Sequence, residues 1–349
     1  MKRKSIDEVI KYSQHALKVI ETKELNENER KAFTKEVVEN FEKYVNPGTL
    51  EYRKSAATDY TSIEWIDQDD GFYDLNGKHY IDWLGGFGVF SHGHRHPKII
   101  KAVRDQLEKQ ALGSAELLDG NRSMLAKILA DISPGGLQYT FFTSSGTESV
   151  ECAMKMAMMA TGRHYFITGT KDFHGKSLGA LSLTGKGIYR KPFLPMLQGV
   201  RHVPFGDFDY LKKTMESMAY IGELPAAIIL EPIEGEIGVI IPPDDYFPKV
   251  RELCDEYDVL LVADEVQTGL GRTGKIFAVD HWDVQPDIIC LAKAMGGGVM
   301  PLSATICIKR CYESYMYDNP WMHSTTTGGN PLACAAGIAA INVMLEEDL

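Results

Sequence analysis

The chain has 349 residues, which is enough to bury a sizeable core and more than a single domain usually needs. A composition of 44% hydrophobic and 24% charged residues is ordinary for a globular protein and excludes disorder over most of the chain. The formal net charge of −11 argues against nucleic-acid binding, and six scattered cysteines without a Cys-x-x-Cys pair argue against a zinc site.

Residues 1–96 are expected to form a helical arm followed by a small antiparallel segment. Helix formers of mixed charge run from Ser5 to Tyr44, and Pro47-Gly48 ends the pattern. A solvated helix pair and an arm that clasps a second subunit both fit this arm. Between Ser62 and Asp82, Asp-Gly and Asn-Gly turns separate alternating residues, which predicts short antiparallel strands. Charges interrupt the first apolar positions, so we expect a cytoplasmic protein without a signal peptide or membrane span.

Residues 97–330 are expected to form a large α/β domain. Helical periods alternate here with apolar runs of strand length, which lie at Tyr139–Phe142, Tyr165–Thr168, Ala226–Leu230, Val259–Ala263 and Ile288–Leu291. Fully apolar strands separated by helices predict a mainly parallel sheet covered on both faces, with ligands bound beyond the carboxyl ends of the strands. Residues 331–349 are expected to begin a long helix that leads to an absent C-terminal domain.

Ser145-Gly146-Thr147 stands where a predicted strand passes into the predicted helix Glu148–Ala160. Backbone N–H groups and the helix dipole favour a phosphate at such a terminus, and the two hydroxyls add donors. A helix cap without a ligand explains the same residues when they are taken alone.

Asp264 and Glu265 end another predicted strand. A carboxylate there could hold a heteroaromatic nitrogen in its protonated, electron-withdrawing state, and Gln267 could bond a ring oxygen. The alternative is a magnesium-binding acidic pair of an ATPase. The sequence has no Gly-rich loop ending in Gly-Lys-Ser/Thr beside the pair, which disfavours that alternative.

Lys293 follows a buried strand and is flanked by small residues and three glycines. Lysine forms Schiff bases once its pKa is lowered, and glycines allow a ligand to approach closely. The strand edge shared with Asp264 favours this role over a merely solvated lysine. Phe173, in a loop after a predicted strand, could stack on a planar cofactor or fill the core. The loop containing Thr326 offers hydroxyls to a phosphate, or only starts the following helix.

Together these segments resemble the class III aminotransferases of fold type I, from about Tyr52 to Leu349. The resemblance rests on a spaced signature, which comprises Asp264-Glu265-Val266-Gln267-Thr268-Gly269, Gly271-Arg272-Thr273-Gly274, Lys293, Ser145-Gly146-Thr147 and Thr326-x-Gly328-Gly329-Asn330-Pro331. It implies an α/β fold with a mainly parallel, seven-stranded type of sheet, and the cofactor pyridoxal 5'-phosphate.

The resemblance also implies roles for the individual residues. Lys293 would carry the cofactor as a Schiff base and later move the proton, while Asp264 would pair with the pyridine nitrogen. The other cofactor contacts would come from Gln267 at the phenolic oxygen, Phe173 and His174 at the ring, and Ser145, Gly146 and Thr147 at the phosphate. Thr326 would contact the cofactor phosphate of a neighbouring subunit, so a homodimer or higher homo-oligomer is implied.

Within the class, the chain is most similar to the members that use the diamine putrescine, through Val45-Asn46-Pro47-Gly48, Leu84–Gly88 and Glu116–Asp119. The expected reaction transfers an amino group from putrescine to 2-oxoglutarate, and Glu234 and Glu236 are expected to bind the second amine. The alternatives are an ornithine, acetylornithine or 4-aminobutyrate aminotransferase, or a truncated cofactor-binding chain without turnover. No metal, nucleic acid or membrane partner is expected.

Overall fold

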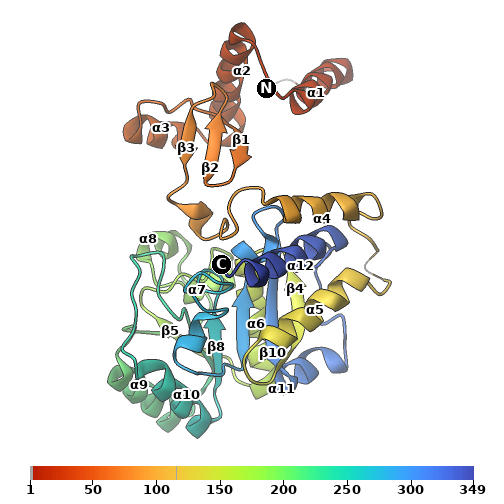
Figure 1. Cartoon of the computed structure of the whole chain (residues 1–349). Coiled ribbons are helices and arrows are strands. Elements are labelled where there is room, and N and C mark those ends of the chain that lie inside the picture. The colour runs from red at the N-terminus through yellow and green to blue at the C-terminus, as the bar shows by residue number, and fades with distance from the viewer. Residues whose placement is uncertain (1–2, 115) are drawn as a thin grey trace. The chain divides into compact units, whose positions relative to one another are not determined.

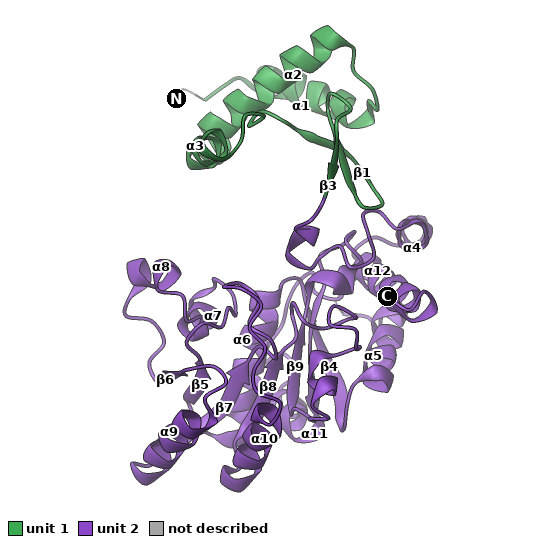
Figure 2. Cartoon of the chain, turned by 60° about the vertical axis from the view of Figure 1, so that its left-hand side comes forward, with its two compact units in different colours: residues 1–81 green, residues 82–349 purple. Residues whose placement is uncertain are grey.

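A computed structural model describes residues 3–114 and 116–349, and it divides into two compact units (Figure 2). The division falls between Ile81 and Asp82, earlier than the boundary expected after residue 96. The intervening residues pack within the second unit: His94 Nε2 lies 3.0 Å from Asp82 Oδ2, and the Phe90 ring packs against Gly298. Their contacts explain why they belong to the second unit.

The first unit contains the predicted arm and antiparallel strands. Helices α1 (Ile6–Glu21) and α2 (Glu27–Asn40) both begin at capping boxes, which satisfy the unpaired N–H groups of the first turn. The helical turn η1 (Phe41–Val45) and α3 (Pro47–Ala56) follow. A three-stranded antiparallel sheet then joins β1 (Glu64–Gln68), β2 (Gly71–Asp74) and β3 (His79–Ile81).

The second unit is built on a seven-stranded sheet with the order β4-β10-β9-β8-β7-β5-β6 (Figure 1). Its strands are β4 (Leu137–Thr143), β5 (Tyr165–Gly169), β6 (Val200–Val203), β7 (Pro225–Leu230), β8 (Leu260–Asp264), β9 (Ile288–Leu291) and β10 (Ser303–Ile308). β10 pairs antiparallel with both of its neighbours, and the other pairs are parallel. The predicted α/β class and mainly parallel sheet are therefore confirmed.

Helices cover both faces of this sheet. The longer ones are α4 (Pro97–Leu107), α5 (Gly120–Ile132), α6 (Gly146–Thr161), α9 (Phe208–Tyr220), α10 (Tyr246–Tyr257) and α12 (Pro331–Glu346). The shorter helices and turns are η2 (Gly85–Phe87), α7 (Leu178–Leu183), α8 (Gly187–Arg190), η3 (Lys191–Phe193), η4 (Ala278–His281), η5 (Lys293–Gly296), α11 (Lys309–Tyr312) and η6 (Glu313–Tyr317). Ala227 and Ile229 of β7 pack with α6, whereas Ile228 and Leu230 pack with α9 and α10. Because both faces are buried, the strands read as continuous apolar runs.

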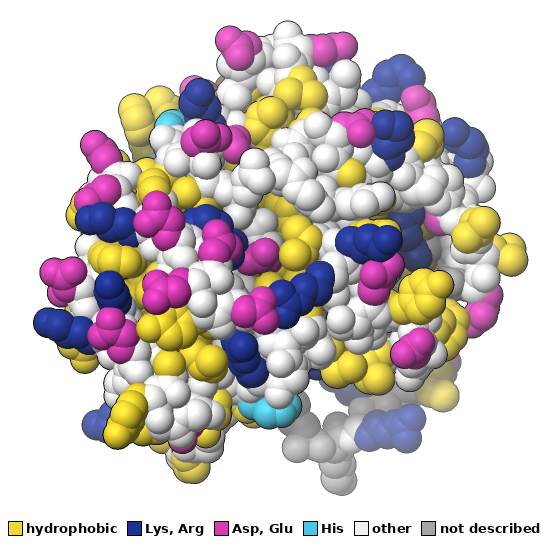
Figure 3. All heavy atoms as spheres, turned by 90° about the horizontal axis from the view of Figure 1, so that it is seen from below, with side chains coloured by type: hydrophobic (Ala, Val, Ile, Leu, Met, Phe, Trp, Pro, Cys, Tyr) yellow, Lys and Arg dark blue, Asp and Glu magenta, His cyan; other side chains and the backbone are white. Residues whose placement is uncertain are grey.

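Surface and helix composition give two further observations. On the face shown in Figure 3, acidic and basic side chains are interspersed with apolar ones. Among the described residues, every helix is too short or too polar to cross a membrane. Helix α12 ends at Glu346, where the Glu347 N–H bonds the Val343 carbonyl, so this helix stops before the last residue of the sequence.

Candidate active site

A cavity of about 620 Å³ opens at the carboxyl ends of the parallel strands. Residues that end or follow β4, β5, β7, β8 and β9 line it, and all of them belong to the second unit. Strand-end side chains and helix N-termini converge at this edge of a parallel sheet, which is why ligands bind there. The cavity therefore lies beyond the carboxyl ends of the strands, where the sequence predicts that a ligand binds.

Lys293 enters the cavity directly after β9 and Ala292. Its Nζ donates a hydrogen bond to Oε1 of Gln267 at 2.8 Å. Burial lowers the pKa of Lys293, although the negative charges of Asp264, Glu231 and Glu236 oppose this effect. A partly desolvated amine with a lowered pKa is a better nucleophile toward a carbonyl group.

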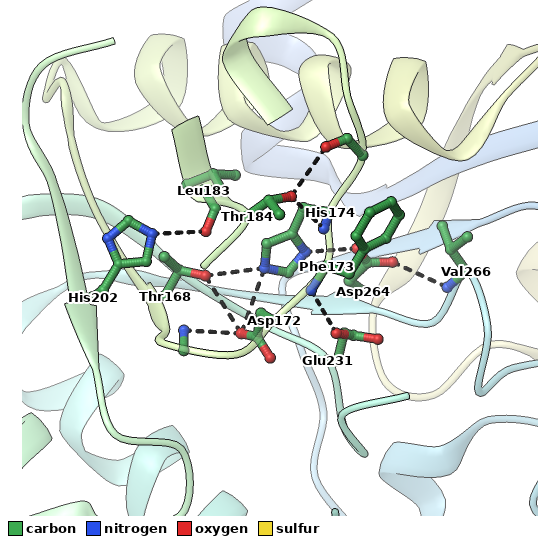
Figure 4. A network of polar contacts seen from close by, with 12 residues as sticks. Thr168, Asp172, Phe173, His174, Leu183, Thr184, His202, Glu231, Asp264 and Val266 are labelled. Atoms are coloured by element: carbon green, nitrogen blue, oxygen red, sulfur yellow. Dashed lines mark hydrogen bonds and ion pairs between the residues drawn. The ribbon is translucent and has the colours of Figure 1, made fainter. Parts of the chain in front are cut away.

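Asp264 ends β8 and is almost fully buried, yet it lines the same cavity. Its Oδ2 lies 2.7 Å from Nδ1 of His174, and its Oδ1 accepts a bond from the Val266 N–H at 3.1 Å (Figure 4). Burial alone would lower the pKa of His174, but hydrogen bonds and charges from Asp172 and Asp264 raise it to about 10. The structure thus brings Asp264 and His174 together in the wall of the cavity.

The first turn of α6 forms another part of the wall, with Ser145, Gly146 and Thr147. Instead of capping the helix, the Ser145 hydroxyl donates to Glu148 Oε2 at 2.9 Å. The Thr147 hydroxyl is 2.6 Å from that of Ser177. The helix N-terminus therefore presents backbone N–H groups and its positive dipole end to the cavity, a favourable setting for an anion.

The structure brings most of the predicted site residues together in the cavity lining and leaves three outside it, Thr326, Glu234 and Glu236. Phe173 lines the cavity from the loop after β5, beside His174. Thr326 is exposed and lies outside the lining, so its contact with a neighbouring subunit's cofactor stays a prediction. Glu234 is also outside: its side chain is fully buried, and burial together with the charge of Asp172 raises its pKa to about 7. The structure does not place Glu234 where a substrate in the cavity would contact it.

Glu236, the other acid expected to bind substrate, lies at the side of the site. Its Oε1 accepts a hydrogen bond from Lys186 Nζ at 3.2 Å and one from the Tyr189 hydroxyl at 3.1 Å. The neighbouring Gly235 packs against the side chain of Gln267, which in turn holds Lys293. Glu236 therefore lies next to a row of contacts, from Gly235 to Gln267, that ends at the amine of Lys293.

Sequence reasoning missed Glu231, which follows β7 and lines the cavity. Its Oε2 accepts the Phe173 N–H at 2.7 Å, and its Oε1 accepts the Gly235 N–H at 3.4 Å. Burial, and then the charges of Asp172 and Asp264, raise its pKa to about 8. The signal was present in the sequence, because Glu231 follows a buried apolar strand just as Lys293 does.

The residues present fit pyridoxal phosphate group by group. Lys293 offers an amine to its aldehyde, Asp264 a carboxylate to its ring nitrogen, the start of α6 a site for its phosphate, and Phe173 an aromatic wall. A Cβ on Gly146 would lie 2.8 Å from Cγ1 of Val266, so glycine lets the first turn of α6 pack closely against this part of the cavity wall.

Comparison with known proteins agrees with this fit. The model of the family described as aminotransferase class-III matches residues 63–349. The ornithine aminotransferase of Toxoplasma gondii ME49 is 30% identical with a TM-score of 0.76, over 84% of this chain and 70% of that one. The taurine:2-oxoglutarate aminotransferase of Bifidobacterium kashiwanohense, solved with PLP and glutamate, is 33% identical with a TM-score of 0.80, over 90% and 74%. An omega-transaminase of Thermomicrobium roseum is 30% identical with a TM-score of 0.81, over 89% and 75%. The chain therefore belongs to the class-III aminotransferases and is a pyridoxal-phosphate-dependent enzyme that transfers amino groups.

Proposed function

We propose that this aminotransferase takes its amino group from a diamine such as putrescine and passes it to 2-oxoglutarate, giving 4-aminobutanal and glutamate. When bound, pyridoxal phosphate supplies the electron sink that makes removal of a proton from the amine carbon feasible. Lys293 would hold the cofactor covalently, and its Nζ would move that proton once the amine donor has displaced it from the cofactor. Asp264 would keep the ring nitrogen protonated, and Gln267, which bonds Nζ of Lys293 in this structure, would contact the phenolic oxygen of the cofactor.

The observation that carries the diamine assignment is the position of Glu236. A diamine has a second, cationic amine several ångströms from the reacting one, and this cation needs an anionic partner once it leaves water. Glu236 is an anion on the flank of the site, and its charge acts on Lys293. Its present partner, Lys186, is only partly buried. A substrate ammonium can therefore replace Lys186 at Glu236 without leaving a buried lysine that has lost its ion pair.

A second candidate is transfer from an amine donor that carries a carboxylate, as in ornithine, acetylornithine or 4-aminobutyrate. Two lysines favour it: Lys186 at Glu236, and Lys176, which lines the cavity with its Nζ 4.2 Å from the centroid of the Tyr189 ring. Either could receive a carboxylate. The 30% identical ornithine aminotransferase supports the same reading.

The deciding experiment compares kcat/KM for putrescine and ornithine, with 2-oxoglutarate as acceptor, in the parent chain, in Glu236→Gln and in Lys186→Gln. We expect the parent to prefer putrescine. Glu236→Gln should lower the putrescine to ornithine ratio by about tenfold, the effect of ~1.4 kcal/mol. Lys186→Gln breaks the same ion pair but leaves the acid, so it should keep or raise the putrescine to ornithine ratio and not lower it.

Each outcome separates the candidates. A parent that prefers ornithine overturns the diamine assignment, and an equal ratio in parent and Glu236→Gln removes Glu236 from substrate recognition. Absorbance of the cofactor-bound chain mixed with putrescine alone tests for chemistry without the acceptor. No change with any amine donor would indicate a cofactor-binding chain without turnover.

A further inference from the structure

We propose that Asp172 is a positioning residue for the reaction: through Thr168 and His174 it fixes a positively charged imidazolium behind Asp264, the carboxylate that we assign to the cofactor's ring nitrogen. The inference deepens the proposed function and rests on its assignment of Asp264. It adds to the site a residue that lies outside the cavity lining.

The loop after β5 places Asp172 and His174 with side chains that are fully buried. Oδ2 of Asp172 accepts the Gly169 N–H at 2.9 Å, which anchors the carboxylate at the end of the strand. Nε2 of His174 lies 3.0 Å from the Thr168 hydroxyl oxygen and 3.5 Å from Asp172 Oδ2. The Thr168 hydroxyl lies 3.4 Å from that same Oδ2 (Figure 4).

A carboxylate at each end of the His174 ring favours a proton on each ring nitrogen. The Thr168 hydroxyl can donate either to Asp172 Oδ2 or to an unprotonated Nε2 of His174. The negative charge of Asp172, 3.5 Å from Nε2, favours the first arrangement, in which Nε2 carries a proton and donates to the Thr168 oxygen. Nδ1 must carry one as well, because its partner at 2.7 Å is the carboxylate of Asp264. Both ring nitrogens are donors, and that is the imidazolium form.

Several titratable side chains on neighbouring strands and loops surround the His174 ring. Asp172 and Asp264 contact it directly. Glu231 from the end of β7 and Glu234 lie nearby, but burial raises their pKa values to about 8 and about 7, so Glu231 is mainly protonated at pH 7. His202 of β6 is kept neutral near pH 7, because burial and then the charge of Arg190 lower its pKa to about 4. Lys293 lies on the far side of Asp264, in the cavity.

The protonation of His174 determines the net charge beside the cofactor's ring nitrogen. An imidazolium beside Asp264 alone would cancel its negative charge, one positive against one negative. With Asp172 as the second carboxylate, the group of three keeps one net negative charge. Asp172 therefore allows a rigid, charge-assisted hydrogen bond to hold Asp264 without removing the negative potential that favours a protonated ring nitrogen.

The test reads the protonation of His174 without turnover. In cofactor-free protein with ¹⁵N-labelled histidine, the ring N–H signals are followed from pH 6 to 10 and assigned with His174→Asn. We expect the parent to keep both ring protons at pH 9. Asp172→Asn, which preserves shape and removes the charge, should lose the Nε2 proton at a pH at least one unit lower, a tenfold change in acidity. The matched control is Glu265→Gln, another buried acid, which bonds Thr268 and Val279 instead.

A second reading uses the cofactor-bound protein. In Asp172→Asn, the cofactor absorbance should show an additional titration between pH 6.5 and 10, which are the ordinary and folded pKa values of His174. The parent and Glu265→Gln should lack this titration. A single ring proton on parent His174 at pH 8 overturns the proposal, even if the variant fails to fold. So does an Asp172→Asn protein in which His174 titrates as in the parent. Because the ring-proton measurement needs neither cofactor nor substrate, a wrong amine donor leaves its outcome unchanged.

Discussion

Lys293 has a backbone φ of 50°, in the left-handed region that side chains other than glycine rarely adopt. Such a conformation costs on the order of 1 kcal/mol, and it persists at functional sites where the surroundings hold it. Here β9 precedes it, the turn η5 begins at it, and Gln267 holds its Nζ. The residue in this strained conformation is the one whose amine enters the cavity.

Lys293→Ala should remove covalent attachment of the cofactor while leaving its non-covalent site. The lowered pKa and the bond to Gln267 single out this amine among the cavity lysines. Borohydride reduction of the cofactor-bound parent followed by peptide mapping should place the label on Lys293.

Lys176→Ala is the control, because Lys176 also lines the cavity but lies at its exposed rim. That variant should keep the label. A label on Lys176 in the parent would contradict the assignment.

At the scale of elements, the start of α6 should be sensitive to the size of one residue. A Cβ on Gly146 would lie 2.8 Å from Val266 Cγ1 and 3.5 Å from the Cβ of Ala292, both in the cavity wall. Gly146→Ala should therefore displace the first turn of α6 and weaken cofactor binding about tenfold, or ~1.4 kcal/mol. The measurement is a titration of cofactor-free protein followed by absorbance.

Gly120→Ala provides the matched control for that titration. Gly120 is also the first residue of a helix, α5, but a Cβ there meets open space. This variant should bind the cofactor as the parent does. Equal affinity in all three proteins would show that the first turn of α6 does not depend on a glycine.

The elements that the sequence predicts best are the strands buried on both faces. β9 matches its apolar run residue for residue, and β7 and β8 match within one residue at each end. β10 was missed because its Ser303 and Thr305 interrupt the apolar pattern. The structure satisfies both hydroxyls in the core, where they donate to the carbonyls of Ser145 and Ser149.

The site residues that the sequence predicts are likewise those at the ends of buried strands. Asp264 and Lys293 were predicted because each ends or follows a buried strand, and parallel strands bring such positions together. Asp172 was beyond prediction, since its role depends on a loop that folds back to Thr168 and on a histidine that reaches β8. Glu234 was expected, with Glu236, to bind the second amine of the substrate. The chain reverses between Glu234 and Ile240, and this local bridge turns Glu234 into the core.

For the whole molecule, the buried titratable groups predict how stability depends on pH. The folded pKa of His174 is about 10, above its ordinary 6.5, so its contribution to stability is complete below pH 6.5 and is lost as the pH rises toward 10. Glu231, raised to about 8 mainly by burial, acts in the same direction, since the folded state again binds the extra proton. Lys293 acts in the opposite direction, because burial lowers its pKa.

The free energy of unfolding of the cofactor-free protein should therefore fall between pH 7 and pH 9, by on the order of 2 kcal/mol. Urea unfolding at a series of pH values measures this slope. In Asp172→Asn the folded pKa values of His174 and Glu231 both move toward their ordinary values, so the slope should become shallower, while Lys293 contributes to both proteins. A slope that is the same in parent and variant, or a parent that gains stability over this range, would show that His174 is not held as an imidazolium in the folded chain.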